Sequence, residues 1–166
     1  MPAQSQTVTR RPERPEDEPL LFQLFASTRE EELDAVAFPI EMRGPFLTMQ
    51  FTAQRRGYAS TFPKAEFQII LVNGQNAGRM VVDRADEEIR LVDMVLLPQH
   101  RNDGIGTALL QGLTREAAVA QKPLRLCVLQ GNRATRLYER LGFRKIGIQG
   151  IYDEMEWRAN PSPGQN

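Results

Sequence analysis

The chain has 166 residues and a formal net charge of zero, because 21 lysines and arginines balance 21 aspartates and glutamates. A neutral chain lacks the positive field that collects nucleic acid, and no apolar run reaches the roughly 20 residues that a bilayer span needs. One cysteine and one histidine exclude an internal disulfide and a recognisable zinc site. We therefore expect no nucleic acid, membrane or metal among the partners of this protein.

The length and the two ends indicate how the chain is organised. About 166 residues suit one domain with its own core. The ends are polar and rich in Pro and Gly, which predicts loose tails at 1–6 and 159–166 around a single domain at 7–158. The first residues lack the basic and apolar regions of a signal peptide, so we expect a cytoplasmic location.

The first half of the chain alternates between strand and helix patterns. A short strand is expected at 7–10, and a helix follows with Leu20, Leu21, Leu24 and Phe25 on one face. A second helix is predicted from about 46 to 58, ending at Gly57. Residues 65–72 predict a strand that turns at Asn73-Gly74 into another at 78–82, which makes a hairpin.

The second half continues the alternation. The predicted elements are a strand at 89–97, a helix opening at Gly104, a strand at 124–129, a helix at 133–141 capped by Asn132, and strands at 143–149 and 151–157. The 89–97 run is apolar and rich in β-branched residues, so it should lie in the middle of a sheet. The pattern predicts an α/β or α+β domain with a mixed sheet.

The loop between the 89–97 strand and the next helix is suited to bind phosphate. The first turn of a helix has unpaired N–H groups and the positive end of the helix dipole, so it can hold an anion without a lysine. Gly104 and Gly106 have no Cβ that would keep a phosphate away from these amides. A tight strand-to-helix turn without a ligand is the alternative. A Walker loop would need Gly-Lys-Ser/Thr, and a dinucleotide fingerprint would want a small residue where Leu109 stands.

Two segments together carry a resemblance to a known family. They are Gln99 to Gly106, and the Asn-x-Ala-x-x-Leu-Tyr-x-x-Leu-Gly-Phe run from Asn132 to Phe143. This combination resembles the GCN5-related N-acetyltransferase (GNAT) superfamily, over Ile89 to about Trp157. The resemblance implies a mixed, mostly antiparallel sheet of about six to seven strands flanked by about four helices.

The resemblance also implies acetyl-CoA as the cofactor and assigns residues to it. The family's Gln/Arg-x-x-Gly-x-Gly/Ala loop has its fixed places filled by Arg101, Gly104 and Gly106. Asn102, Asp103, Gly104, Ile105, Gly106 and Thr107 would contact the pyrophosphate. Met94, Val95 and Leu96 would lie at a strand bulge that pairs with the pantetheine arm. Asn132 matches an asparagine that contacts the cofactor, a role that can coexist with capping a helix.

By the same resemblance, Tyr138 would be the general acid that protonates the departing CoA thiolate. A thiol-like pKa near ~8.5 makes a phenol within hydrogen-bond reach a reasonable proton donor. A tyrosine that only packs in the core is the alternative for this position.

The general base is not evident from the sequence. The places where the family often has a glutamate hold Arg90 and Cys127. Asp93 could take the amine proton through a water molecule, although an aspartate paired with an arginine in the sheet is the competing interpretation. Glu66 and His100 are weaker candidates, and Cys127 is better explained as a small buried apolar residue than as a nucleophile.

These residues predict direct transfer of an acetyl group from acetyl-CoA to a primary amine through a ternary complex. A non-catalytic acyl-CoA-binding or sensing module of the same fold is the alternative, and a Rossmann-like nucleotide enzyme is a third hypothesis. The acceptor is undecided between an antibiotic, a polyamine, an amino acid and a protein N-terminus. A homodimer is left open.

Overall fold

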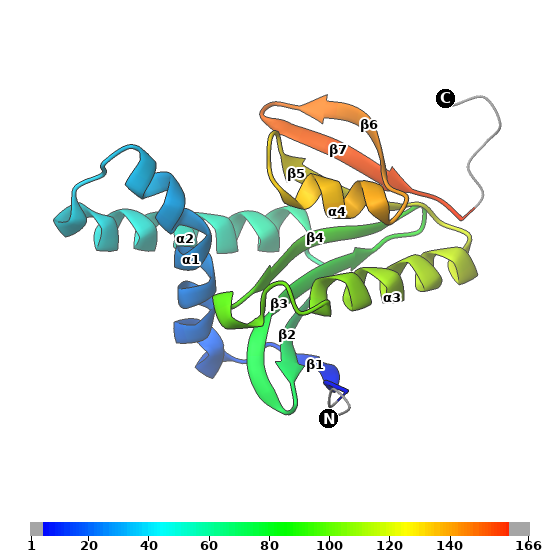
Figure 1. Ribbon diagram of the computed structural model, residues 1–166, viewed down its shortest axis with the longest axis horizontal. Coiled ribbons are helices and arrows are strands. Elements are labelled where there is room, and N and C mark those ends of the chain that lie inside the picture. The colour runs from blue at the N-terminus through cyan, green and yellow to red at the C-terminus, as the bar shows by residue number, and fades with distance from the viewer. Residues whose placement is uncertain (1–4, 160–166) are drawn as a thin grey trace. The chain divides into compact units, whose positions relative to one another are not determined.

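The computed structural model describes residues 5–159 (Figure 1). The predicted tails fall mostly at 1–4 and 160–166, outside the described residues. The chain divides into two compact units. The first comprises the residues up to 81 together with 93–101, and the second comprises 82–92 together with the residues from 102 onward. The single domain at 7–158 stays a prediction.

Seven strands form one mixed sheet in the order β1-β2-β3-β4-β5-β7-β6. The strands are β1 (Val8–Pro12), β2 (Glu66–Val72), β3 (Gln75–Arg84), β4 (Ile89–Leu96), β5 (Leu124–Leu129), β6 (Arg144–Gln149) and β7 (Tyr152–Trp157). The pairs β1–β2, β5–β7 and β6–β7 are antiparallel, whereas β4 and β5 are parallel. The apolar strand β4 occupies the middle of the order, as its composition predicted.

Four α-helices and two short 3-10 turns complete the fold. They are η1 (Pro15–Asp17), α1 (Glu18–Ala35), α2 (Ile40–Thr61), η2 (Pro98–His100), α3 (Ile105–Ala120) and α4 (Ala134–Arg140). The expected mixed sheet of six to seven strands with about four helices is thus confirmed. Along the described residues, no helix combines the length and apolar character needed to cross a membrane.

Helix α2 is longer than the sequence predicted. It begins at Ile40 and not at 46, and it continues through Gly57 to Thr61. A glycine inside a helix costs only about 1 kcal/mol relative to alanine, which packing of the helix readily offsets. Gly57 therefore does not end α2, and Pro45 is accommodated within its second turn.

The core of the first unit is centred on α1 and α2. Leu21 and Phe25 of α1 pack with Leu47 and Phe51 of α2 and with Ile69 of β2. The rings of Phe22 and Phe51 meet edge to face with centroids 5.5 Å apart. Aromatic pairs in this arrangement are favoured by about 0.5–1.5 kcal/mol beyond their area burial.

The core of the second unit lies on one face of β4, β5 and β7. Leu124, Leu126 and Val128 are buried on β5, while Arg125 and Cys127, which alternate with them, point to the opposite face. Helix α3 contacts β5 and buries a stripe of four residues, Ile105, Leu110, Leu113 and Ala117. This alternation gives the second unit one apolar and one charged sheet face.

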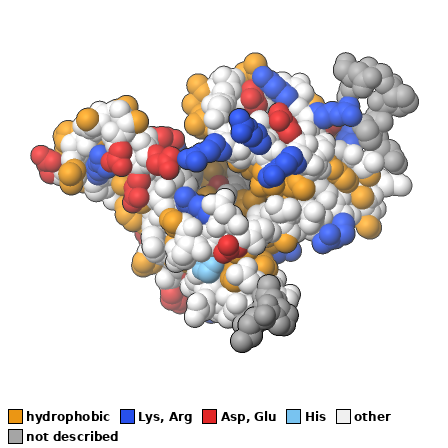
Figure 2. Space-filling model, in the orientation of Figure 1, with side chains coloured by type: hydrophobic (Ala, Val, Ile, Leu, Met, Phe, Trp, Pro, Cys, Tyr) orange, Lys and Arg blue, Asp and Glu red, His pale blue; other side chains and the backbone are white. Residues whose placement is uncertain are grey.

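The outer surface carries both signs of charge. Basic and acidic side chains are spread over the face of the molecule shown in Figure 2, in keeping with their equal numbers in the sequence. Among residues 5–159, no three His, Cys, Asp or Glu side chains are grouped as a metal site would require.

Candidate active site

Strand β4 contains one residue more than its neighbour β3 over the same span. At the hairpin end, the Ala85 amide donates to the Glu88 carbonyl at 3.0 Å. At the far end, the Leu97 amide donates to the Ala77 carbonyl at 2.8 Å. Eight positions separate Ala77 from Ala85, but nine separate Glu88 from Leu97. An extra residue in one strand of a pair is a β-bulge, which bends the strand and leaves backbone groups outside the ladder.

The neighbours of Gly78 locate this bulge. Gly78 of β3 faces two residues of β4, because a Cβ built on it would meet both the Val95 carbonyl oxygen and the Leu96 Cα. Val95 and Leu96 of β4 together lie opposite the single residue Gly78, so they form the bulge. These positions, together with Met94, are the ones that the sequence assigned to the pantetheine arm. The family resemblance implied a bulge at these positions, although no local residue pattern in the sequence is specific to one.

Arg101 follows β4 and binds back to it. Its Nε donates to the Leu96 carbonyl oxygen at 3.0 Å, and its Nη2 donates to the Ser27 hydroxyl of α1 at 3.1 Å. The guanidinium thus contacts the bulge and α1 at once. It also stands at the first fixed place of the family's phosphate loop.

The segment 102–107 leads into α3 with an exposed, uncapped N-terminus. Asn102 and Gly104 have positive φ angles of +64° and +79°. Gly104 is the N-cap of α3, no side chain of the described residues caps it, and a Cβ at this position would meet nothing within 4 Å. The amides of Ile105, Gly106 and Thr107 precede the first intrahelical bond, which the Ala108 amide donates to Gly104 at 3.0 Å. Such amides suit the oxygens of a diphosphate.

The N-cap of α4 is Arg133, whereas the sequence predicted Asn132 for this position. Asn132 lies one residue earlier, where it still accepts hydrogen bonds from the first residues of the helix. Its Oδ1 accepts a hydrogen bond from the Ala134 amide at 2.8 Å, and its carbonyl accepts from the Thr135 amide at 3.1 Å. The side-chain carbonyl is therefore engaged at the start of α4. A contact of Asn132 with the cofactor stays a prediction.

Tyr138 lies on α4 with its side chain partly buried. Its ring packs edge to face on Phe143, with centroids 5.7 Å apart. Its carbonyl accepts hydrogen bonds from the Leu141 and Phe143 amides at the end of the helix. The Leu-Tyr-x-x-Leu-Gly-Phe run thus forms a local unit, in which Gly142, with φ of +97°, turns the chain from α4 into β6.

Asp93 of β4 is paired with Arg79 of β3. The Arg79 Nη2 donates to the Asp93 Oδ2 at 2.9 Å, and the side chains are only 5% and 19% exposed, respectively. Burial raises the pKa of the Asp93 carboxyl above its ordinary value, while the Arg79 charge and hydrogen bond and the Met94 amide act in the opposite direction. Asp93 is therefore a carboxyl with a raised pKa that is held by an arginine, as in the competing interpretation of the sequence.

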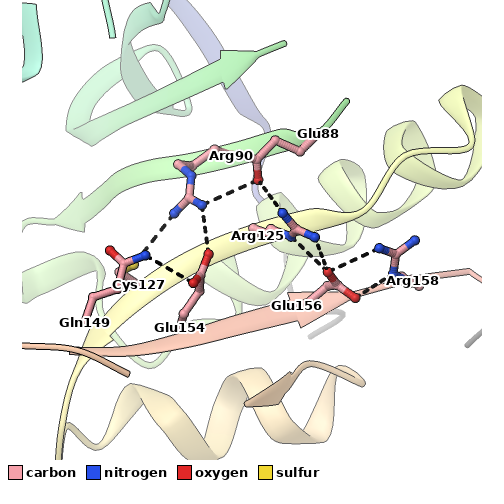
Figure 3. Close-up of polar contacts among 8 residues, drawn as sticks. All are labelled: Glu88, Arg90, Arg125, Cys127, Gln149, Glu154, Glu156 and Arg158. Carbon is pink, nitrogen blue, oxygen red and sulfur yellow. Dashed lines mark hydrogen bonds and ion pairs between the residues drawn. The ribbon is translucent and has the colours of Figure 1, made fainter. Parts of the chain in front are cut away.

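Arg90 and Cys127 lie on the charged face of the second unit (Figure 3). Cys127 is exposed and not buried as the sequence predicted, because it alternates along β5 with the buried residues Leu126 and Val128. The Arg90 Nη2 bonds to the Glu154 Oε1 at 3.0 Å, and its Nη1 lies 3.6 Å from the Cys127 sulfur. Glu88 contacts both Arg90 and Arg125, at 3.5 and 3.7 Å. The carboxylate of Glu154, which the sequence analysis missed, is thus neutralised by Arg90. These contacts form a structural ion network and not a free base.

The predicted site residues fall into the two units. Asp93, Met94–Leu96 and Arg101 belong to the first, whereas Asn102–Thr107, Asn132 and Tyr138 belong to the second. Sequence reasoning missed Gly78. It offered an arginine in the sheet as a partner of Asp93, which the structure shows to be Arg79, but it did not name that residue. The signal for Arg79 was a lone charge within an apolar run, Gly78 to Val82, and a buried charge needs a partner.

Comparison with known proteins identifies the family. Residues 63–145, which make up half of the chain, match the acetyltransferase (GNAT) domain family. The chain matches none of the curated proteins by sequence. This protein belongs to the GNAT acetyltransferase family. Its acetyl donor is acetyl-CoA, the cofactor that this family uses.

Solved structures agree in fold. PaiA N-acetyltransferase from Thermoplasma acidophilum, in complex with coenzyme A, has a TM-score of 0.67 at 16% identity, covering 92% of this chain and 99% of its own. An acetyltransferase from Thermus thermophilus has a TM-score of 0.65 at 16% identity over 92% and 97%. One from Streptococcus agalactiae has a TM-score of 0.62 at 16% identity over 94% and 99%.

Proposed function

We propose that this protein transfers the acetyl group of acetyl-CoA directly to a primary amine, through a ternary complex and without an acyl-enzyme. The observation that carries the proposal is the extra residue of β4 at Val95 and Leu96. It provides backbone groups outside the ladder directly upstream of an uncapped helix N-terminus. A cytoplasmic location and a homodimer stay predictions.

The described residues suit the two polar parts of the cofactor. The amides at 105–107, at the positive end of α3, would hold the diphosphate, and the open space at Gly104 leaves room for its oxygens. The backbone of Met94 to Leu96 would pair with the amide-containing pantetheine arm. The bound cofactor supplies a thioester, whose carbonyl carbon the amine attacks.

Asp93 is the proposed base. A lysine-like amine is only about one part in several thousand neutral near pH 7, so something must remove its proton before attack. Asp93 adjoins the proposed pantetheine segment and has a raised pKa caused by burial. It would accept the proton through a water molecule.

Tyr138 is the proposed acid. When the carbon–sulfur bond breaks, the CoA thiolate takes up a proton, and a phenol hydroxyl can donate it. The Phe143 ring packs against the Tyr138 ring and restricts its orientation.

A second candidate is a non-catalytic acyl-CoA-binding module. It is favoured by the hydrogen bond that engages Asp93 with Arg79, and by Arg90 and Cys127 at the places where the family often has a glutamate. Such a module would bind acetyl-CoA and form no product.

The two candidates differ in turnover. The protein should be incubated with acetyl-CoA and a panel of polyamines, aminoglycosides, amino acids and peptides, while CoA thiol release and acetylated product are measured. Transfer to at least one primary amine, and none to its N,N-dimethyl analogue, is the expected result. Saturable acetyl-CoA binding without product from any amine would favour the module.

A further inference from the structure

Arg79 is fixed from two sides inside the first unit. One side of its guanidinium donates to Asp93, and its Cζ lies 5.6 Å from the centroid of the Tyr58 ring of α2. A guanidinium over an aromatic ring is held by a cation–π attraction that strengthens when water is excluded. With 5% of its side chain exposed, Arg79 has little freedom to turn away from Asp93.

Other charged groups around this pair come from α1, from α2 and from the segment after β1. Glu13 lies just after β1. Burial raises the pKa of the Glu13 carboxyl, and the positive charge of Arg79 acts to lower it. Arg55 of α2 lies 3.9 Å from the Glu13 Oε1. Arg29 of α1 also acts on Asp93 electrostatically. Among these charged groups of the described residues, Arg79 is the one that donates a hydrogen bond to the Asp93 carboxylate.

We propose that Arg79 is a positioning residue for the transfer reaction, which holds the Asp93 carboxylate in one orientation and keeps it ionised, while Tyr58 holds Arg79. This inference rests on the proposed function of Asp93 as base. A protonated carboxyl cannot accept the amine proton. Burial drives Asp93 towards that protonated form, and an arginine cannot itself lose its charge to relieve the pair.

The competing explanation is that the pair only stabilises the first unit. Breaking a buried ion pair by removing one partner destabilises a protein whether or not the pair serves catalysis. A fall in stability or activity alone would not distinguish these roles. The test therefore needs the protonation state of Asp93 itself.

The experiment compares Arg79→Gln, Arg79→Lys and Arg11→Gln with the unchanged protein. Arg11 pairs with Asp17 at 2.8 Å in the same unit and serves as a control for the loss of a partly buried arginine–aspartate pair. The Asp93 carboxyl is titrated by carbon-13 NMR in each, its signal being assigned by its loss in Asp93→Asn. The dependence of kcat/KM on pH is measured with the best amine.

In Arg79→Gln, we expect the Asp93 pKa to rise and the acidic limb of kcat/KM to move to higher pH by the same amount. Arg79→Lys should shift the Asp93 pKa and the acidic limb in the same direction but by less. This variant provides the test if Arg79→Gln does not fold. Arg11→Gln should change neither the Asp93 pKa nor the acidic limb of kcat/KM. An unchanged Asp93 pKa in a folded Arg79 variant would overturn the inference. Full activity of Asp93→Asn would instead reject Asp93 as base, which is a separate failure.

Discussion

Gly78 of β3 lies so close to the carbonyl oxygen of Val95 that no side chain fits between them. A Cβ at this position would overlap that oxygen and lie 3.0 Å from the Leu96 Cδ2. The bulge in β4 therefore depends on a glycine in the strand beside it.

Gly78→Ala should lower the free energy of unfolding by about 1–3 kcal/mol, the usual effect of forcing atoms into a packed region. It should also weaken acetyl-CoA binding, because the backbone at Val95 must move. Urea denaturation and calorimetry measure the two effects. Gly57→Ala is the control: it lies in α2 with nothing within 4 Å, so helix propensity should raise stability by about 0.5–1 kcal/mol. Equal stability of Gly78→Ala and the unchanged protein would contradict the close contact.

Gly104→Val should weaken the binding of CoA and acetyl-CoA alike, because both contain the diphosphate that we assign to this loop. A valine at φ of +79° is strained, and its branched side chain would fill the space above the α3 amides. Titration calorimetry gives both affinities.

The control for Gly104 is Gly74→Val in the β2–β3 turn. Gly74 also has a positive φ, +78°, with nothing within 4 Å of its Cβ position. Both variants should lose about 1–2 kcal/mol of stability from backbone strain, but only Gly104→Val should lose cofactor affinity. If the folded Gly104→Val protein binds CoA normally, the phosphate site lies elsewhere.

Tyr138→Phe should lower kcat by about 10²–10⁴-fold, the usual contribution of general acid catalysis, with little change in CoA affinity. The edge-to-face packing on Phe143 is retained because only the hydroxyl is removed. Tyr152→Phe, at an exposed tyrosine of β7, should leave kcat unchanged. A Tyr138→Phe enzyme with normal kcat, measured where the chemical step limits the rate, would reduce Tyr138 to a packing residue.

Asp93→Asn should lose most activity near neutral pH and recover part of it at alkaline pH, where more of the amine is already neutral. The Asp93 carboxylate can accept a proton only at pH values above its raised pKa. The fraction of amine that is already neutral keeps growing as the pH rises towards the amine pKa of about 10.4, so the mutant depends less on a base in alkali. Rates across pH, compared with Asp86→Asn in an exposed turn, test this. A loss of the same size at every pH would indicate a structural role.

Asp17 should make the protein sensitive to acid. Its pKa is lowered first by the hydrogen bonds from Arg11, at 2.8 Å, and further by the Arg14 amide. A lowered pKa in the folded state adds stability above the unfolded value of about 3.9, and this stability is lost as the pH falls through the folded pKa. The stability gap between the unchanged protein and Asp17→Asn should therefore close in acid, as urea midpoints at several pH values would show. A constant gap would contradict this linkage.

Much of this fold could be predicted from the sequence, because the apolar periods of β4, β5 and α3 are strong, Pro98 follows β4 and Gly104 marks the start of α3. The start of α2 could not, since residues 40–45 contain Gly44 and Pro45, which normally indicate a loop. For the site, the glycines of the loop were evident in local sequence, and so was the start of α4 near Asn132, to within one residue. The bulge and the Asp93–Arg79 pair arise from contacts between strands, which no local pattern specifies.

Pro45 also divides α2 into two parts of different stability. A proline inside a helix has no N–H to donate to the carbonyl four residues earlier, here that of Glu41. The turn before it contains Gly44 and the exposed side chains of Ile40 and Met42, whereas Phe51 anchors the part after it in the core. In this turn, only the Arg43 and Gly44 amides can donate to a helix carbonyl four residues earlier, and we expect them to exchange with deuterium much faster than the amides near Phe51. We therefore expect the first turn of α2 to open locally without any global unfolding of the protein.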